Sequence, residues 1–308
     1  MKKTLRLLSF LLALLLLLSS CDLLPSTPSD TGNAQGNEQS PFYHEKLGEV
    51  PVYNGDPFVI VNNGVPTFTD EEKSTASYET YAPLDSLGRC GVCIASIGVD
   101  IMPTAPRESI SSVYPSGWDN NPYDFVDGGY LYNRCHLIGF QLTGENANKN
   151  NLITGTRYLN IEGMLPFENM IADYVKDTEN HVVFRVTPIY NENDLVASGV
   201  WMEAYSIEDE GEGISFSVYA FNVQPGVVID YADGSNYATG EETPKKDETP
   251  SQGDQTEAGY VINKKSGVFH RPSCVGVKSM SAQNRVDSSA SREALVEDGY
   301  RPCGTCDP

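Results

Sequence analysis

The sequence predicts an α+β fold in which an antiparallel sheet packs against a helix. Residues 181–187 and 213–223 alternate apolar and polar side chains as strands do, and 195–205 is expected to pair between them. Residues 164–175 place apolar side chains at three- and four-residue spacing, which indicates an amphipathic helix. A run of strands with a helix on one side is typical of a layered α+β domain.

The N-terminus carries an export signal. Positive charges precede residues 7–18, an apolar run of 12 residues, whereas a helix needs about 20 to cross a bilayer. The run ends in Leu-Ser-Ser-Cys, which resembles the lipobox of bacterial lipoproteins. The resemblance implies that residues 1–20 are a lipoprotein signal peptide and that Cys21 is lipidated, which anchors the chain to the outer face of the cytoplasmic membrane. The alternative is an ordinary secretory signal with an incidental cysteine.

Two polar segments divide the rest of the chain. Residues 21–40 and 235–259 are poor in apolar residues and rich in Ser, Thr, Pro, Gly and Gln, which is typical of a flexible tether and of an interdomain linker. Between them, residues 41–234 form the predicted main domain. Residues 260–308 form a second, small unit that is slightly basic, whereas the whole chain has a formal net charge of −21.

The most informative stretch is residues 132–139, Tyr-Asn-Arg-Cys-His-Leu-Ile-Gly. Asn151 follows His136 by 15 residues, Asn160 follows 9 residues later, and Glu168 another 8. This pattern resembles the DNA/RNA non-specific endonuclease family, whose ββα-metal (His-Me finger) site is marked by an Asp-Arg-Gly-His motif with Asn and Glu residues at this spacing. The resemblance implies a nuclease domain with a central antiparallel sheet and flanking helices.

The chemistry of phosphodiester hydrolysis agrees with that resemblance, because the reaction needs a base, a cation and groups that neutralise the phosphate. A histidine is mostly neutral at physiological pH, so His136 is expected to be the general base. An amide oxygen suits Mg²⁺ or Mn²⁺, so Asn160 is expected to bind that ion. Supporting roles, in holding a metal-bound water or in binding the phosphate, are expected for Glu168, Asn151, Arg134 and Arg157.

The same residue types also have ordinary structural uses. A histidine is often a partly buried hydrogen-bonding residue, an asparagine often a turn or cap residue, and a Glu or Arg often a solvated surface residue. However, a helix turns by about 100° per residue, so eight residues make two full turns plus about 80°. On a continuous helix, Asn160 and Glu168 would therefore point to the same side. Two positions depart from the family pattern: Asn133 stands where Asp is usual, and Cys135 where Gly is usual.

Cysteines upstream of the motif offer two arrangements. A Cys90–Cys135 disulfide would brace the histidine loop, because disulfides persist in exported proteins. The alternative is a redox pair of Cys90 and Cys93, although no thioredoxin-like pattern surrounds it. Arg107 is a further candidate for a phosphate contact.

The tail contains the usual complement of a closed structural zinc site. One histidine and three cysteines supply it: His270, Cys274, Cys303 and Cys306. A unit of about fifty residues has little core, so a Zn²⁺ ion would help it to fold. The tail resembles the small Ada-like metal-binding domain found appended to some nucleases. The alternative, in an exported protein, is disulfide bonding among these cysteines.

Together these features predict a lipid-anchored surface endonuclease that hydrolyses DNA and RNA, and no protein partner is implied. The net charge of −21 argues against a passive nucleic-acid binder, because affinity for phosphates comes mostly from Lys and Arg, but it is compatible with a metal-dependent enzyme. Two alternatives stay open. One is a catalytically inactive nucleic-acid-binding surface lipoprotein, and the other is a structural or redox lipoprotein organised by its cysteines.

Overall fold

The computed structural model describes residues 43–240 and 259–308, apart from Ser273, Ser279, Ser281, Gly304, Thr305 and Asp307. The expected signal peptide, the lipidation site Cys21, the tether and most of the expected linker lie outside the described residues. Within the described ranges, no helix combines the length and the apolar character needed to span a membrane.

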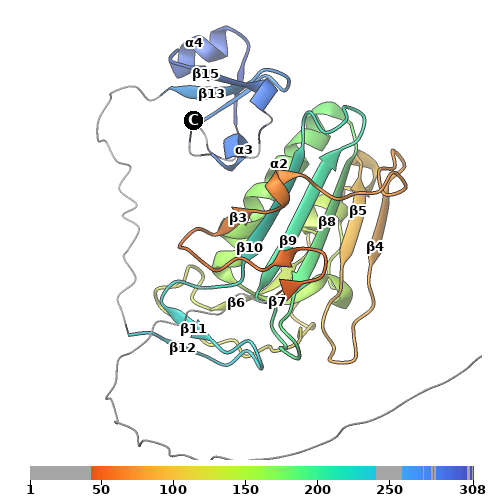
Figure 1. The fold of residues 1–308 in the computed structure, drawn as a ribbon, viewed down its shortest axis with the longest axis vertical. Coiled ribbons are helices and arrows are strands. Elements are labelled where there is room, and N and C mark those ends of the chain that lie inside the picture. The colour runs from red at the N-terminus through yellow and green to blue at the C-terminus, as the bar shows by residue number, and fades with distance from the viewer. Residues whose placement is uncertain are drawn as a thin grey trace, which may run out of the picture. The chain divides into compact units, whose positions relative to one another are not determined.

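A six-stranded antiparallel sheet forms the centre of the main domain (Figure 1). Its strand order is β3 (Phe58–Ile60), β10 (Ser215–Phe221), β9 (Gly199–Ser206), β8 (Val182–Ile189), β5 (Cys93–Ile97) and β4 (Tyr78–Tyr81). The three strands expected from the alternation are β8, β9 and β10, and β9 lies between the other two, as predicted. The expected helix is α2 (Leu165–Thr178), which packs on one face of the sheet.

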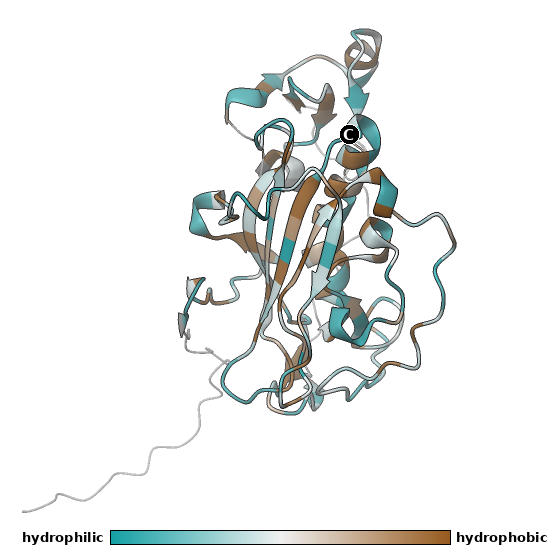
Figure 2. Cartoon of the chain, turned by 90° about the vertical axis from the view of Figure 1, so that its right-hand side faces the viewer, coloured by the Kyte–Doolittle hydropathy of each residue, from teal (hydrophilic) through white to brown (hydrophobic). Residues whose placement is uncertain are grey.

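The central strands are buried on both faces, and Figure 2 shows hydrophobic residues along them. Because successive residues of a strand point to opposite faces, Met202 of β9 joins the core under α2, whereas Trp201 joins a second apolar cluster. Glu203 of β9 is 0% exposed and pairs with Arg185 of β8 at 2.7 Å. Side chains are therefore packed on both faces of the sheet, and α2 covers one of these faces.

A smaller antiparallel pair, β6 (Tyr132–His136) and β7 (Leu152–Thr156), carries the motif. The connection between them contains α1 (Phe140–Thr143) and the 3-10 turn η3 (Lys149–Asn151). After β7 the chain enters the π-helical turn η4 (Leu159–Met164), which continues into α2. This order of strand, strand and helix is the arrangement expected for a ββα-metal site.

The remaining elements of the main domain are short. They are β1 (Tyr43–His44), β2 (Gly48–Glu49), η1 (Asn62–Gly64), η2 (Val99–Ile101), β11 (Val227–Ile229) and β12 (Asn236–Ala238). Val228 of β11 is opposite Tyr237 of β12 in an antiparallel ladder. Residues 236–238, at the start of the expected linker, thus lie in a paired strand.

The tail contains its own four-stranded sheet, in the order β15-β13-β14-β16. Its elements are β13 (Tyr260–Asn263), β14 (Val268–His270), α3 (Val275–Lys278), η5 (Ala282–Asn284), β15 (Arg285–Ser288), α4 (Arg292–Glu297) and β16 (Arg301–Pro302). The turn between β13 and β14 is closed by Asn263 Oδ1, which accepts hydrogen bonds from the backbone N–H groups of Lys265 and Ser266. The apolar clusters of this unit are small.

Candidate active site

Elements β6, η4 and α2 line a common cavity of about 530 Å³. Six of the candidate site residues lie around it: Arg107, Arg134, His136, Arg157, Asn160 and Glu168. Asn133 also lines the cavity, and its Nδ2 is buried without a hydrogen-bond partner among the described residues. The fold therefore brings together residues that are up to 61 positions apart in the chain.

The hydrogen bonds of His136 determine which ring nitrogen can act as a base. Nε2 lies 2.8 Å from the carbonyl oxygen of Asn146, and a carbonyl only accepts, so Nε2 carries the proton. Nδ1 therefore has the free lone pair, and Arg107 Nη2 donates to it over 3.3 Å. His136 is 6% exposed, and this burial lowers its pKa below the ordinary value of 6.5. The ring is thus held in one orientation, with the lone pair of Nδ1 facing Arg107.

Asn160 lies in η4, and its Oδ1 accepts a hydrogen bond of 3.2 Å from the thiol of Cys135. Cys135 is fully buried in β6. It fits there because Gly155 of β7 has no side chain: a Cβ at Gly155 would lie 2.6 Å from Cys135 Cβ. The cysteine that departs from the family pattern therefore contacts the amide that is expected to bind the metal.

The predicted Cys90–Cys135 disulfide is not present in the structure, in which both residues are free thiols. Cys90 Sγ contacts the carbonyl oxygens of Lys149 and Leu152, whereas Cys135 Sγ contacts Asn160. The two thiols thus have different neighbours in the structure. Cys93 is also a free thiol in the structure.

Asn151 differs from its expected role as a phosphate or metal-water contact. Its side chain is fully buried at the end of η3. Oδ1 accepts from the backbone N–H of Ile138, and Nδ2 donates to the carbonyl oxygen of the same residue, each at 2.9 Å. Because this pair occupies the amide, Asn151 braces the chain just after His136.

Glu168 lies in the first turn of α2 and is 8% exposed. Burial raises the pKa of its carboxyl to about 7, although the backbone N–H of Gly139 and the charge of Arg107 oppose the shift. The carboxylate lies directly against Gly139, where an added Cβ would come within 2.6 Å of Oε2. Gly139 therefore makes room for the carboxylate.

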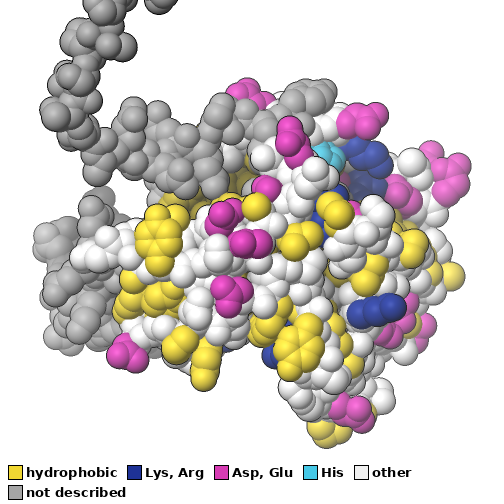
Figure 3. All heavy atoms as spheres, turned by 90° about the horizontal axis from the view of Figure 1, so that it is seen from below, with side chains coloured by type: hydrophobic (Ala, Val, Ile, Leu, Met, Phe, Trp, Pro, Cys, Tyr) yellow, Lys and Arg dark blue, Asp and Glu magenta, His cyan; other side chains and the backbone are white. Residues whose placement is uncertain are grey.

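Arginines supply positive charge around the cavity. Arg157 donates from Nε and Nη2 to Asp127, which holds its guanidinium in place, and Arg107 reaches His136. Arg134 lies over the rings of Trp118 and Tyr114. Figure 3 shows Lys and Arg side chains beside a histidine on a face that also carries acidic groups. Positive charge is thus concentrated locally in an acidic chain.

Two partners of His136 leave little or no signal in the sequence. Arg107 is only a secondary candidate there, because an arginine 29 positions before the histidine belongs to no motif. The carbonyl of Asn146 could not be found at all, since a backbone oxygen leaves no signature in residue type.

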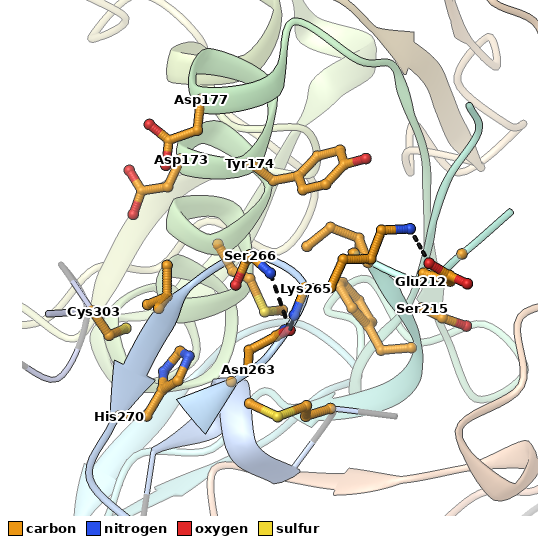
Figure 4. A pocket seen from close by; sticks show the side chains of 18 of the residues that line it. Asp173, Tyr174, Asp177, Glu212, Ser215, Asn263, Lys265, Ser266, His270 and Cys303 are labelled. Carbon is orange, nitrogen blue, oxygen red and sulfur yellow. Dashed lines mark hydrogen bonds and ion pairs between the residues drawn. The ribbon is translucent and has the colours of Figure 1, made fainter. Parts of the chain in front are cut away.

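In the tail, the four expected zinc ligands form one cluster, with their ligand atoms within 4.8 Å of one another. His270 and Cys303 (Figure 4) are neighbours because they follow Phe269 and Pro302, which are paired across β14 and β16. His270 Nδ1 is buried and has no hydrogen-bond partner among the described residues. The thiol of Cys274 lowers the pKa of Cys303 below its ordinary value. One nitrogen and three sulfurs fit a tetrahedral metal ion.

Comparisons with known proteins agree with this geometry. Residues 70–208 match the family model of the DNA/RNA non-specific endonucleases. This stretch therefore resembles a DNA/RNA non-specific endonuclease domain. No curated protein was found to match the chain.

Two solved structures resemble the nuclease domain. NucA from Streptococcus agalactiae with a bound magnesium ion is 25% identical, with a TM-score of 0.52, over 58% of this chain and 85% of NucA. The Sda1 nuclease with a bound zinc ion is 25% identical, with a TM-score of 0.52, over 60% of this chain and 97% of Sda1. The family match and these neighbours support nuclease activity for the domain.

The contact between Gly139 and Glu168 leads to a prediction. A Gly139→Ala variant should cleave DNA about 10- to 100-fold more slowly, the usual effect of disturbing a group beside a metal site. Its unfolding temperature should change little, because the displaced carboxylate is the end of a flexible side chain. Kinetics of Gly139→Ala, Glu168→Ala and the double variant would test this. If the effects of the two single variants add in full, Gly139 does not act through Glu168.

Proposed function

We propose that this chain is a metal-dependent endonuclease that hydrolyses phosphodiester bonds of DNA and RNA without sequence preference. The observation that carries the proposal is the hydrogen bond from His136 Nε2 to the carbonyl of Asn146. It leaves Nδ1 of a neutral ring as a base beside a cavity that Asn160 and Glu168 also line. The family match and the magnesium-bound neighbour support the same function.

The donor atoms of the cavity fit a hard divalent cation. Asn160 Oδ1 and the Glu168 carboxylate are oxygen donors, which Mg²⁺ and Mn²⁺ prefer. Asn160 would bind the ion directly, and Glu168 would hold one of its waters. When bound, the ion would neutralise charge that develops on the phosphoryl oxygens.

Residues of the chain itself would supply the base and bind the phosphate. His136 Nδ1 takes a proton from the attacking water, and the Asn146 carbonyl stabilises the positive ring that results. Arg134 and Arg157 bind phosphate oxygens, and Asp127 keeps Arg157 oriented. Arg107, which donates to Nδ1 in the absence of substrate, would turn to the phosphate as the water takes its place.

The proposed location is the cell surface, and it rests on the sequence alone. An export signal followed by Cys21 would leave the chain lipid-anchored on the outer face of the cytoplasmic membrane. The tail would be a lobe stabilised by Zn²⁺ bound to the cluster of His270 and three cysteines. The alternative of an inactive binding protein is disfavoured by the oriented, neutral imidazole.

Cleavage of supercoiled plasmid DNA and of RNA by the purified chain tests the proposal. Both polymers should be cut with Mg²⁺ and neither in excess chelator. The rate should fall in acid, because a proton on Nδ1 removes the lone pair of the base. Burial lowers the pKa of His136, so the part of this loss that is due to the ring should have its midpoint below pH 6.5. Cleavage that is unaffected by chelator, or that does not slow in acid, would contradict the proposal.

A further inference from the structure

An exposed aromatic side chain contacts Arg134, which lines the cavity, but does not join the apolar core. The ring of Tyr114 is 5.1 Å from the guanidinium carbon of Arg134, yet Tyr114 is 71% exposed. Trp118, on the other side of the same short segment, also lies under Arg134 but packs with Tyr132 in an apolar cluster. Tyr114 belongs to none of the apolar clusters that the described residues form. The stability of the core therefore does not explain this ring.

The segment that presents Tyr114 is firmly held. The carbonyl oxygen of Ser116 accepts from Thr154 Oγ1 at 2.7 Å, and Ser116 Oγ donates to the carbonyl oxygen of Leu195 at 2.6 Å. Gly117 has φ +65°. It lies so close to Gly234 that a Cβ added to Gly234 would overlap the carbonyl oxygen of Gly117. Tyr114 thus presents its ring to solvent from an ordered segment.

We propose that Tyr114 is a stacking platform for an unpaired nucleobase of the substrate, next to the phosphate that Arg134 binds. The inference rests on the proposed nuclease function. Aromatic side chains stack on any base, because every base has a π-face, and this tolerance agrees with cleavage that has no sequence preference. A base inside a duplex has both faces covered by its neighbours. The platform therefore favours single-stranded or frayed nucleic acid.

Steady-state kinetics on three DNA substrates would test this platform. They are a single strand, the duplex of the same sequence, and a single strand made of abasic sites. Tyr114→Ala should raise KM for the single strand about tenfold, while kcat changes little, because a stacking contact is lost. The same variant should behave as wild type on the abasic strand. Tyr114→Phe keeps the ring and should behave as wild type on all three substrates.

The matched control is Tyr237→Ala, which removes a tyrosine of similar exposure (64%) whose ring, among the described residues, lies against no arginine of the cavity. It should leave all three substrates unaffected. A wild-type KM for Tyr114→Ala on the single strand would overturn the proposal. So would an equal loss on the abasic strand, since the ring would then act only through the phosphate contact of Arg134. If the wild-type chain cuts none of the substrates with Mg²⁺, the proposed function itself fails.

Discussion

A His136→Ala variant is expected to cleave DNA and RNA about 10²- to 10⁴-fold more slowly than the wild-type chain in Mg²⁺. The variant lacks the nitrogen that takes the proton from water, while the cavity residues Asn160 and Glu168 remain. The measurement is kcat/KM on plasmid DNA and on RNA, with thermal unfolding recorded to verify the fold. Added imidazole should restore part of the lost rate, since it can enter the space that the ring leaves.

His181→Ala is the matched control for this experiment. His181 pairs with Glu208 at 2.6 Å and does not line the cavity, so its loss should leave the cleavage rate unchanged. A wild-type rate in His136→Ala would exclude His136 as the general base. A rate that falls equally in both histidine variants would point to general loss of structure.

The second large effect is expected in the tail. The wild-type chain should bind about one equivalent of Zn²⁺, and Cys274→Ser should lose it, because three ligands hold zinc far more weakly than four. The free energy of zinc binding to small domains is about 10–16 kcal/mol, so the tail should unfold when the ion is lost. Metal analysis and limited proteolysis of the tail would measure both results. Magnesium-dependent cleavage should persist, since the residues proposed for catalysis lie in the main domain.

Cys90→Ala provides the control, because it removes a thiol of the main domain and should keep the zinc. The competing expectation is disulfide bonding in the tail. A chain that contains no zinc and fewer than three free thiols among Cys274, Cys303 and Cys306 would support that alternative and contradict the zinc site.

Local periodicity predicted the long central strands and the helix, but not the shorter strands. β8, β9 and α2 are each eight residues long or longer, so enough apolar residues fall within each element to make it visible in the sequence. β6 contains Asn133, Arg134 and His136 within five residues. Here the site chemistry decides the residue types, and no burial pattern marks the strand. The motif therefore located the site where periodicity failed.

By itself, the sequence determined the layered α+β class and identified His136, Asn160 and Glu168 as residues that gather in one place, because period and spacing are properties of the chain. Only the tertiary structure decided the tautomer of His136, the bracing role of Asn151 and the separation of Cys90 from Cys135. Each of these depends on backbone atoms or side chains that meet only after folding. Tertiary contacts of this kind cannot be predicted from residue type or spacing.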